Sequence, residues 1–464
     1  MPVSEYDVIV VGGGIGGLVV AVELGRRGLR TLLLEAAAEP GGCVRLHSVG
    51  GLTLDRGADS FALARPAVAE LATRLDLPVE RPIGAGAWVR HEAGDAPLPA
   101  GALLGIPSDP AAADVRRIIG RAGVLRARAD LLLPGRAPDN VGLGHLVARR
   151  MGRRVLRRLV EPVVGGVYST DPGPLDIDAV APGLRAALAD SGSLAAAVRR
   201  LRAGAPPAGA AVAGLTGGMG TLTGALVGAL LATGGEIRCG APVQTVTPAG
   251  TGWSVTTASG DLLQTEVVVL ALSAGDAAPL VSRATAGGVR LPTPPASEVV
   301  LVTLVVDEPA LDVAPRGTGV LVGGRARGVA AKALTHATAK WRYLASAAGP
   351  GRHVLRLSYG RGDRLPPDAA FPDLALADAA ALLGIPLRRE QLADHAVVHY
   401  TGQLAAHRSD LADARSRFHQ DLTAWPGLVV TGSAVAGTGL GAVVANATAT
   451  AATITGNAGE GWTA

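Results

Sequence analysis

The pattern of hydrophobic and polar positions is clearest at the beginning of the chain. Residues 6–11, YDVIVV, are almost entirely apolar, which predicts a strand buried on both faces of a parallel sheet. A glycine-rich turn follows, and apolar positions at helical spacing then predict a helix that ends at about Gly28. A second apolar run, from Thr31 to Glu35, predicts the next strand. The chain is therefore predicted to begin with a β-α-β unit.

Strand patterns return in later parts of the chain, separated by a long helical stretch. The predicted later strands lie within residues 236–246, 253–257, 266–271, 299–306 and 353–359, and residues 427–455 carry a strand, a glycine-rich loop and a helix. Helical patterns rich in arginine, with prolines at the joints, fill the region between about residues 81 and 201. The prediction is an α/β protein with a Rossmann-like cofactor domain, a mixed-sheet substrate domain and an inserted helical domain.

The predicted boundaries divide the cofactor domain into three separate pieces. Residues 1–80, 211–285 and 411–464 are assigned to the cofactor domain, 81–210 to the substrate and helical domain, and 286–410 to the substrate-binding sheet domain.

Composition excludes several classes of protein. The 464 residues are 48% hydrophobic and 18% charged, which excludes intrinsic disorder, and a net charge of +4 is too small to indicate a nucleic-acid binder. Two cysteines, Cys43 and Cys239, without a CxxC pair or a histidine cluster argue against a disulfide scaffold and against a metal site. Only Lys332 and Lys340 are lysines among 43 basic residues, so the chain is rich in arginine.

Two apolar stretches resemble targeting or membrane segments. Residues 8–22 follow Glu5 and Asp7 instead of a basic region, so a signal peptide is not expected. Residues 427–459 are uncharged, but they contain Gly, Ala, Thr and Asn where a membrane helix would have Leu, Ile and Phe. The sequence therefore predicts a cytoplasmic protein without a transmembrane helix.

The first turn has the spacing of a dinucleotide-binding motif. Gly12, Gly14 and Gly17 follow the first strand, and Glu35 stands 18 residues after the last of these glycines. The first glycine permits a tight turn, the second lets the backbone approach a pyrophosphate, and the third lets helix and strand pack closely. Glu35 would accept hydrogen bonds from a ribose and disfavours the 2′-phosphate of NADP. The motif alone leaves FAD and NAD as alternatives.

The segment after the second strand helps to separate the two cofactors. In NAD dehydrogenases the β-α-β alternation continues, whereas residues 39–61 of this chain turn to loops and short strands. Gly41 and Gly42 predict a second close backbone approach, and residues 57–60 a third. This arrangement is typical of flavoproteins with two dinucleotide-binding domains.

Longer motifs are distributed over nearly the whole chain. They are VVGGGIGGL (10–18), PGGCVR (40–45), GADSFALARP (57–66), LLGIPSDP (103–110), LVEPVVGGVYSTDPGPLDIDAVAP (159–182), LTGGMGTL (215–222), AKWRYLA (339–345), RLSYGR (356–361) and GSAVAGTGL (432–440). Together they resemble the protoporphyrinogen oxidase family of FAD-dependent oxidoreductases, and within it the bacterial coproporphyrinogen III oxidases of Gram-positive type. The EPVVGGVYSTDP stretch is the most specific of them.

The resemblance implies an enzyme that removes hydrides from a porphyrinogen, passes them to FAD and releases hydrogen peroxide after reoxidation by molecular oxygen. Coproporphyrinogen III, oxidised to coproporphyrin III in heme biosynthesis, is the leading substrate, because four propionates suit an arginine-rich chain. No catalytic side chain is required, since the flavin carries the chemistry. The alternatives are protoporphyrinogen IX oxidase, an amine oxidase or carotenoid-type desaturase, and a diverged protein that binds FAD or porphyrin without turnover.

The resemblance also assigns residues to the cofactor. Those expected at the pyrophosphate are Gly12, Gly13, Gly14, Ile15, Gly16 and Gly17, and those expected at the ribose and adenine are Glu35, Ala36 and Val243. Those expected around the flavin are Cys43, Gly57, Ala58, Asp59, Ser60, His399, Thr438, Gly439 and Leu440. His399 falls where the family often has an aromatic residue over the flavin.

Substrate contacts are expected from two segments and from arginines. Leu103 and Leu104, together with the turn formed by Gly166, Val167 and Tyr168, match positions that line the family's cavity. The arginines predicted to clamp propionates are Arg45, Arg342 and Arg356.

Two features depart from the family or extend beyond it. The stretch HYTGQLAAHRSDL at residues 399–411 differs from the family's usual pattern, which favours the non-catalytic alternative. Residues 148–162 predict one basic amphipathic helix, with Arg149, Arg153 and Arg157 in one row and Arg150, Arg154 and Arg158 in the next. Such a face would suit a peripheral contact with an anionic membrane, the next enzyme of heme synthesis, or steering of the anionic substrate.

Overall fold

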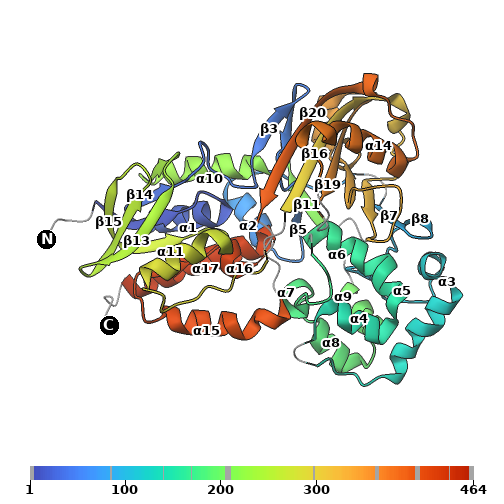
Figure 1. Cartoon of the computed structure of the whole chain (residues 1–464), viewed down its shortest axis with the longest axis horizontal. Coiled ribbons are helices and arrows are strands. Elements are labelled where there is room, and N and C mark those ends of the chain that lie inside the picture. Colours follow the sequence, from blue (N-terminus) through green and yellow to red (C-terminus); the bar gives the residue numbers. More distant parts are fainter. Residues whose placement is uncertain are drawn as a thin grey trace.

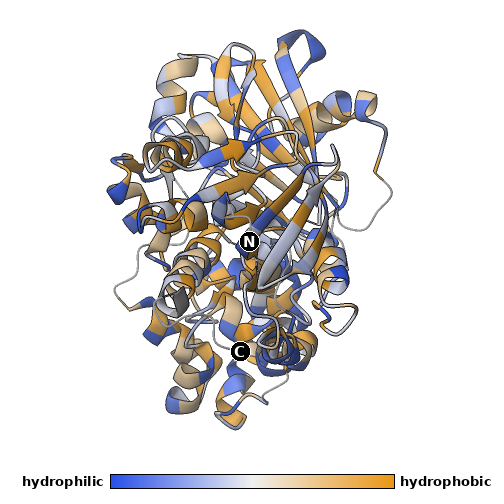
Figure 2. Ribbon diagram, turned by 90° about the vertical axis from the view of Figure 1, so that its left-hand side faces the viewer, coloured by the Kyte–Doolittle hydropathy of each residue, from blue (hydrophilic) through white to orange (hydrophobic). Residues whose placement is uncertain are grey.

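The computed structural model describes residues 5–83, 86–138, 141–168, 170–203, 211–295, 298–360, 365–402, 408–437 and 439–458. Figure 1 shows three regions: a sheet covered by helices, a second sheet with α14 on its outer side, and a group of helices from α3 to α9. The predicted α/β class is confirmed. Figure 2 shows that apolar residues concentrate on the strands and on the inward sides of the helices.

The apolar N-terminal strand lies at the centre of the first, seven-stranded sheet. β1 (Tyr6–Val11) pairs in parallel with β2 and with β15. In sheet order the strands are β12 (Glu236–Arg238), β2 (Thr31–Leu34), β1, β15 (Leu262–Leu270), β14 (Gly252–Thr257) and β13 (Val243–Ala249), and β21 (Leu428–Val430) also pairs with β15. One sheet is thus assembled from three distant parts of the chain.

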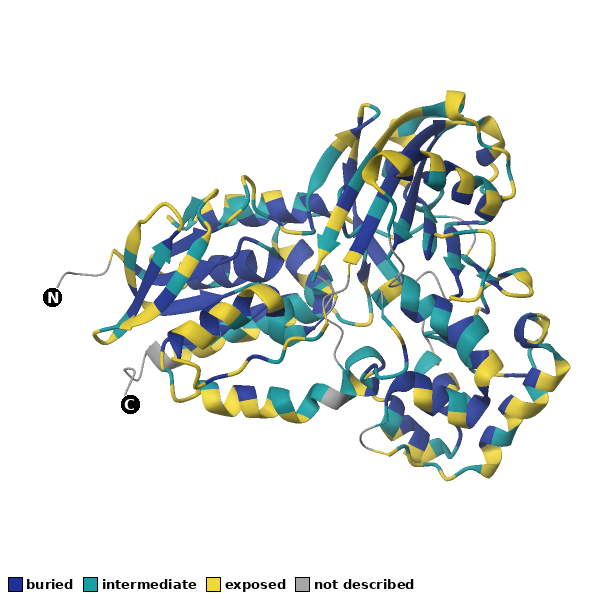
Figure 3. Ribbon diagram, viewed as in Figure 1, coloured by how far each residue is buried: buried dark blue, intermediate teal, exposed yellow. Residues whose placement is uncertain are grey.

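Helices cover both faces of this sheet, which explains why β1 is apolar throughout. Val8 and Val10 contact one layer, whereas Ile9 and Val11 contact the other. The first layer consists of α1 (Ile15–Gly25), α2 (Ala67–Arg74), α10 (Gly220–Ala232) and α17 (Leu440–Ala458). The second consists of α11 (Ala274–Ala284), α16 (Ser433–Ala436) and Phe418 of α15 (Ala412–Leu422). Figure 3 shows α1 buried and α15 largely exposed.

The second sheet also has seven strands and two unlike faces. In order they are β20 (Leu392–Thr401), β16 (Glu298–Asp307), β19 (Arg352–Tyr359), β18 (Ala333–His336), β17 (Gly319–Val322), β7 (Trp88–His91) and β8 (Gly94–Pro97). Val300 and Val302 pack toward α14 (Phe371–Leu383) on one face. Val305 and Val354 of the opposite face pack with Trp341 and with residues of the β3–β4 hairpin. This second face is turned toward the loops of the first sheet.

The remaining elements join these sheets. The short strands are β3 (Leu46–Val49) with β4 (Leu52–Asp55), β9 (Ala102–Leu103) with β10 (Ile106–Pro107), and β11 (Val212–Leu215) between β5 (Phe61–Ala62) and β6 (Val79–Glu80). Two short helices, α12 (Ala337–Lys340) and α13 (Arg342–Ala348), follow β18. In the described part of the chain, no helix has the length and apolarity needed to cross a membrane.

The helical region corrects two sequence expectations. Its helices are α3 (Ala113–Arg128), α4 (Leu143–Met151), α5 (Arg153–Val155), α6 (Glu161–Tyr168), α7 (Ile177–Val180), α8 (Leu184–Ser191) and α9 (Leu194–Arg202). The predicted single basic helix is wrong, because Gly152 adopts φ 89° and ends α4, and Leu156–Val160 is π-helical. The predicted turn at residues 166–168 is likewise the last part of helix α6.

Candidate functional site

The glycines of the first turn have three distinct roles. Gly12 has φ +105°, and a Cβ atom there would lie 2.7 Å from the carbonyl oxygen of Ala271. A Cβ atom at Gly17 would overlap the carbonyl oxygen of Gly12, so this glycine lets α1 pack against the end of β1. A Cβ atom at Gly14 would meet nothing within 4 Å. The open space at Gly14 lies at the N-terminus of α1, where backbone N–H groups favour an anion.

Glu35 is fixed beside this turn. Its Oε2 accepts a hydrogen bond of 2.6 Å from the backbone N–H of Gly13, and its Oε1 accepts one of 2.8 Å from Ala37. Ala36 between them is exposed. The acidic side chain at the end of β2 is thereby held at the edge of the open space, as the motif predicts.

The other predicted cofactor residues lie in the surrounding elements. Ile15 and Gly16 are buried in the first turn of α1, and a Cβ atom at Gly16 would lie 3.1 Å from the Cα of Gly432. The C-terminal segment therefore packs against the beginning of α1. Val243 is the half-buried first residue of β13. Gly439 has φ +108° and Leu440 begins α17, whereas Thr438 lies outside the described residues.

A second loop meets the first turn, and a third loop meets the second. The backbone N–H of Gly41 donates a 2.7 Å hydrogen bond to the carbonyl of Gly13, and Gly14 forms an isolated bridge with Gly41. The N–H of Ala58 donates to the carbonyl of Cys43 at 3.1 Å, and a Cβ atom at Gly57 would overlap that same carbonyl. The structure thus brings together the three glycine-containing loops that the sequence separates by up to 45 residues, Gly12 to Gly57.

An ion-pair network ties the third loop to the second sheet. Lys340 Nζ lies 3.1 Å from Asp59 Oδ2 and donates to Ser60 Oγ at 3.2 Å. Arg356 on β19 donates a 2.5 Å hydrogen bond to the carbonyl of Gly57, and its Nη1 lies 3.8 Å from Asp59 Oδ2. Burial alone would raise the pKa of Asp59, but the charges of Lys340 and Arg356 and their hydrogen bonds hold it well below its usual range. Asp59 therefore stays a carboxylate.

Around the same loops, four buried polar atoms have no hydrogen-bond partner among the described residues. They are Arg45 Nε, His47 Nε2, Arg356 Nε and Tyr400 Oη. Tyr400 Oη lies 2.8 Å from the position of a Cβ atom at Gly57, which places it directly at the third loop. Burial, followed by the charges of Arg356 and Arg56, lowers the pKa of His47. Such groups are rare in folded proteins and indicate a place where a polar ligand supplies the missing partners.

The structure does not bring every predicted residue to these loops. His399 faces α14: its Nε2 lies 2.8 Å from Asp368 Oδ1 and its ring centroid 6.3 Å from that of Phe371. Side chains alternate along β20, so the next residue, Tyr400, faces the loops in its place. Arg342 is exposed, its backbone N–H donates to Glu80 at 2.8 Å, and its side chain has no hydrogen bond or ion pair with the residues that the structure describes.

The predicted substrate segments lie between the helical region and the second sheet. A Cβ atom at Gly166 would overlap Leu321 of β17, so the absence of a side chain lets α6 approach the sheet. Leu103 and Leu104 are half-buried in the turn of the β9–β10 hairpin. Leu104 adopts φ +49°, a strained conformation for leucine. Val167, by contrast, is 57% exposed.

Arg65 connects α7 with the beginning of α17. Its Nη2 donates to the carbonyl of Ala179 at 3.0 Å, and its Cβ lies 2.9 Å from the position of a Cβ atom at Gly441. Its charge also acts on the hydroxyl of Tyr168, although burial is the larger effect and raises the pKa of that tyrosine. Arg65 therefore lies between α7 and the beginning of α17, and Tyr168 is near enough for the arginine charge to act on its hydroxyl.

The sequence of the chain matches a known protein family over most of its length. Residues 15–454 match the family described as flavin containing amine oxidoreductase. The chain belongs to this family. Its cofactor is accordingly FAD, as the resemblance implied, and the three glycine loops, Glu35 and the unpartnered polar atoms fit that cofactor.

Individual relatives are similar over nearly the whole chain. A coproporphyrinogen III oxidase from Mycobacterium leprae is 30% identical over 463 residues, covering 94% of this chain and 96% of its own. One from Mycobacterium tuberculosis (H37Rv) is 31% identical over 382 residues, covering 80% of each. A crystal structure from Exiguobacterium sp. 255-15, provisionally named a protoporphyrinogen oxidase, has a TM-score of 0.83 at 26% identity and covers 97% of this chain and 99% of its own. The resemblance drawn from the motifs is confirmed.

Sequence reasoning missed three residues of this site. Lys340 could have been found from the sequence, because it is one of only two lysines and lies in the motif AKWRYLA. Tyr400 follows His399, the residue predicted at the flavin, and lies on the opposite face of β20, beside Gly57. His47 has no recognisable signal, because only the fold of the β3–β4 hairpin brings it near Arg356.

Proposed function

We propose that this chain oxidises coproporphyrinogen III to coproporphyrin III, with FAD as hydride acceptor and molecular oxygen as final acceptor, releasing one hydrogen peroxide for each electron pair. The observation that supports this substrate most strongly is the similarity to the Mycobacterium leprae coproporphyrinogen III oxidase along 94% of the chain. Arginines beside the candidate flavin loops add a chemical argument, since guanidinium groups pair with propionates.

FAD, when bound, supplies the hydride-accepting ring system. The side chains of the chain then have positioning roles. Arg356 and Lys340 hold the loop at Gly57–Ser60 against the second sheet, so Arg356 is assigned to the loop rather than to a propionate. Arg45 is half-buried, its Nη1 donates a long hydrogen bond of 3.5 Å to the carbonyl of Glu39, and its Nε has no partner among the described residues. It is the remaining propionate candidate. Each hydride transferred to FAD is accompanied by loss of one proton from the macrocycle to water, and none of the described side chains is assigned as a base.

The finer predictions on partners rest on surface features of the helical region. Leu125, Leu131 and Leu132 are 75%, 72% and 87% exposed, and exposed arginines of α3 lie in the same segment. This combination supports a peripheral contact with the inner, anionic face of the cytoplasmic membrane. The same surface would serve for transfer of product to the next heme-pathway enzyme.

The test is a side-by-side assay of the purified, FAD-containing enzyme in air. Porphyrin fluorescence is followed from coproporphyrinogen III and from protoporphyrinogen IX, and peroxide is measured in parallel. Faster oxidation of the four-propionate substrate with peroxide release is the expected result. Faster oxidation of protoporphyrinogen IX would assign the alternative substrate. Absence of porphyrin formation from either, with FAD bound, would leave the non-catalytic binding protein.

A further inference from the structure

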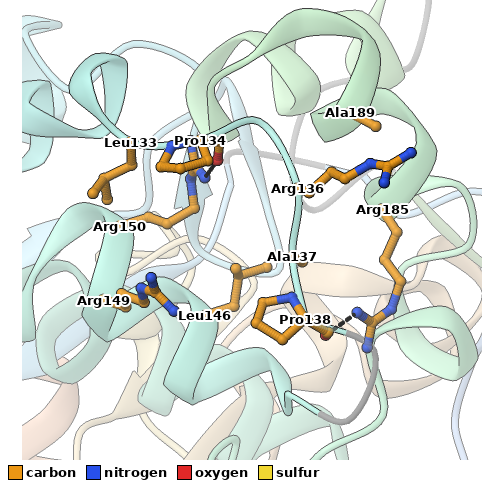
Figure 4. Close-up of a pocket in the computed structure, with 10 residues that line it drawn as sticks. All are labelled: Leu133, Pro134, Arg136, Ala137, Pro138, Leu146, Arg149, Arg150, Arg185 and Ala189. Atoms are coloured by element: carbon orange, nitrogen blue, oxygen red, sulfur yellow. Dashed lines mark hydrogen bonds between the residues drawn. The ribbon is translucent and has the colours of Figure 1, made fainter.

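The helical region contains a cavity that does not belong to the candidate flavin site. It has a volume of about 640 Å³, within the range of small-molecule sites. Its lining residues are Leu133, Pro134, Arg136, Ala137, Pro138, Leu146, Arg149, Arg150, Arg185 and Ala189. Four of these ten are arginines and none is acidic. Figure 4 shows the loop of residues 133–138 between Arg149 and Arg150 of α4 and Arg185 of α8.

Two of the arginines hold the loop of residues 133–138 in place at one side of the cavity. Arg150 is 3% exposed, forms an ion pair with the buried Asp130, and donates a 2.5 Å hydrogen bond to the carbonyl of Pro134. Arg185 donates a 2.7 Å hydrogen bond to the carbonyl of Pro138. The loop is thus held at both ends by guanidinium groups, and Arg136 is carried between these fixed points (Figure 4).

The other two arginines have no partner within the described part of the chain. The guanidinium groups of Arg136 and Arg149 take part in no hydrogen bond or ion pair there, and both residues are exposed. They come from different walls, one from the loop and one from α4. Leu133, Ala137 and Leu146 provide apolar surface in the same cavity. The lining therefore suits an anion that carries more than one carboxylate on an apolar body.

We propose that this cavity is a second binding site for porphyrin polycarboxylates, separate from the flavin site, with Arg136 and Arg149 each binding a propionate. The choice of ligand rests on the proposed function, because the proposed reaction consumes and produces a flat apolar macrocycle with four carboxylates. Planar guanidinium groups bind carboxylates in a bidentate manner, and the four basic residues that line this cavity are arginines. The site would retain product outside the reaction centre.

The test compares porphyrin binding by the FAD-containing enzyme and by an R136A/R149A variant. Coproporphyrin III is titrated into each protein, and its fluorescence change gives stoichiometry and affinity. The expected result is two binding sites per wild-type chain and loss or at least about tenfold weakening of one site in the variant, because two charge-assisted contacts are removed. An R121A/R153A variant removes two exposed arginines of the same region that do not line the cavity, and it should bind like the wild type.

Unchanged binding by R136A/R149A, or equal weakening in R121A/R153A, would overturn the proposal. Displacement of coproporphyrin by equimolar inorganic phosphate would also overturn it, because the cavity would then be a general anion site. Initial rates of coproporphyrinogen oxidation should be unchanged in R136A/R149A. The proposed function can fail independently of this site. In that case neither porphyrinogen is oxidised, although coproporphyrin III binding still depends on Arg136 and Arg149. Melting curves of all variants confirm that they are folded.

Discussion

The first turn provides a prediction in which two neighbouring glycine substitutions have opposite effects. Gly17→Ala places a methyl group on the carbonyl oxygen of Gly12, and overpacking of this kind costs about 1–3 kcal/mol of folding free energy. Gly14→Ala meets no atom within 4 Å, and its φ of −68° and ψ of 175° suit alanine. In the apoprotein, the lower entropy of the unfolded chain stabilises by about 0.4–1 kcal/mol. Gly14 is the N-cap of α1, and the poorer N-cap propensity of alanine offsets part of this gain.

The same Gly14→Ala change should nevertheless weaken FAD binding. Its methyl group occupies the open space at the N-terminus of α1, and loss of one charge-assisted hydrogen bond there, about 1.5–3 kcal/mol, corresponds to about 10- to 100-fold in affinity. Urea unfolding of the apoproteins gives stability, and flavin fluorescence gives FAD affinity. Gly14→Ala with wild-type FAD affinity would refute the position assigned to the pyrophosphate. An apoprotein of Gly14→Ala as unstable as that of Gly17→Ala would refute the packing argument.

Three further predictions follow from individual side chains. Arg150→Met leaves Asp130 without its buried partner and should lower the free energy of unfolding, measured with urea, by about 3–5 kcal/mol. Arg153→Met on the surface should lower it by less than about 0.5 kcal/mol. Burial, assisted by the charge of His353, lowers the pKa of His336 to about 3. Between about pH 6.5 and 3, the histidine is therefore protonated in the unfolded chain but not in the folded chain. On acidification through this range, the free energy of unfolding of the wild type should fall by roughly 3–5 kcal/mol more than that of His336→Gln. Lys340→Met should lower FAD affinity by releasing the Asp59 loop, and Lys340→Arg should restore most of it, as measured by flavin release; equal affinities in both variants would contradict this role.

The parts of the fold set by local sequence were predictable. β1, the glycine turn, α1 and β2 follow one another within 30 residues. Few other arrangements of helix and strand fit their apolar pattern and spacing. Strands β15, β16 and β19 were also located, because each is a long apolar or alternating run. Glu35 and the glycines of the first turn accordingly meet at the end of β1, and their contacts with FAD stay a prediction.

Features that depend on distant contacts were not predictable. The hydrogen bond between Arg356 and Gly57 joins residues 299 positions apart. The spacing of apolar and polar residues along the chain does not predict such a contact. His399 and Tyr400 differ by one position in a strand whose two faces are both partly polar, so the pattern did not determine which side chain faces the loops. The arginine-rich stretch has helical spacing throughout, but Gly152 breaks it and Arg150 turns inward to Asp130.

The central claim is that a porphyrinogen reduces the flavin bound by this chain. The most direct measurement mixes the FAD-containing enzyme with excess coproporphyrinogen III under anaerobic conditions and records the flavin absorbance. The account predicts that the oxidised flavin band bleaches as porphyrin fluorescence appears, and that admission of oxygen restores the band with formation of hydrogen peroxide. A flavin that remains oxidised in the presence of excess coproporphyrinogen III would contradict it.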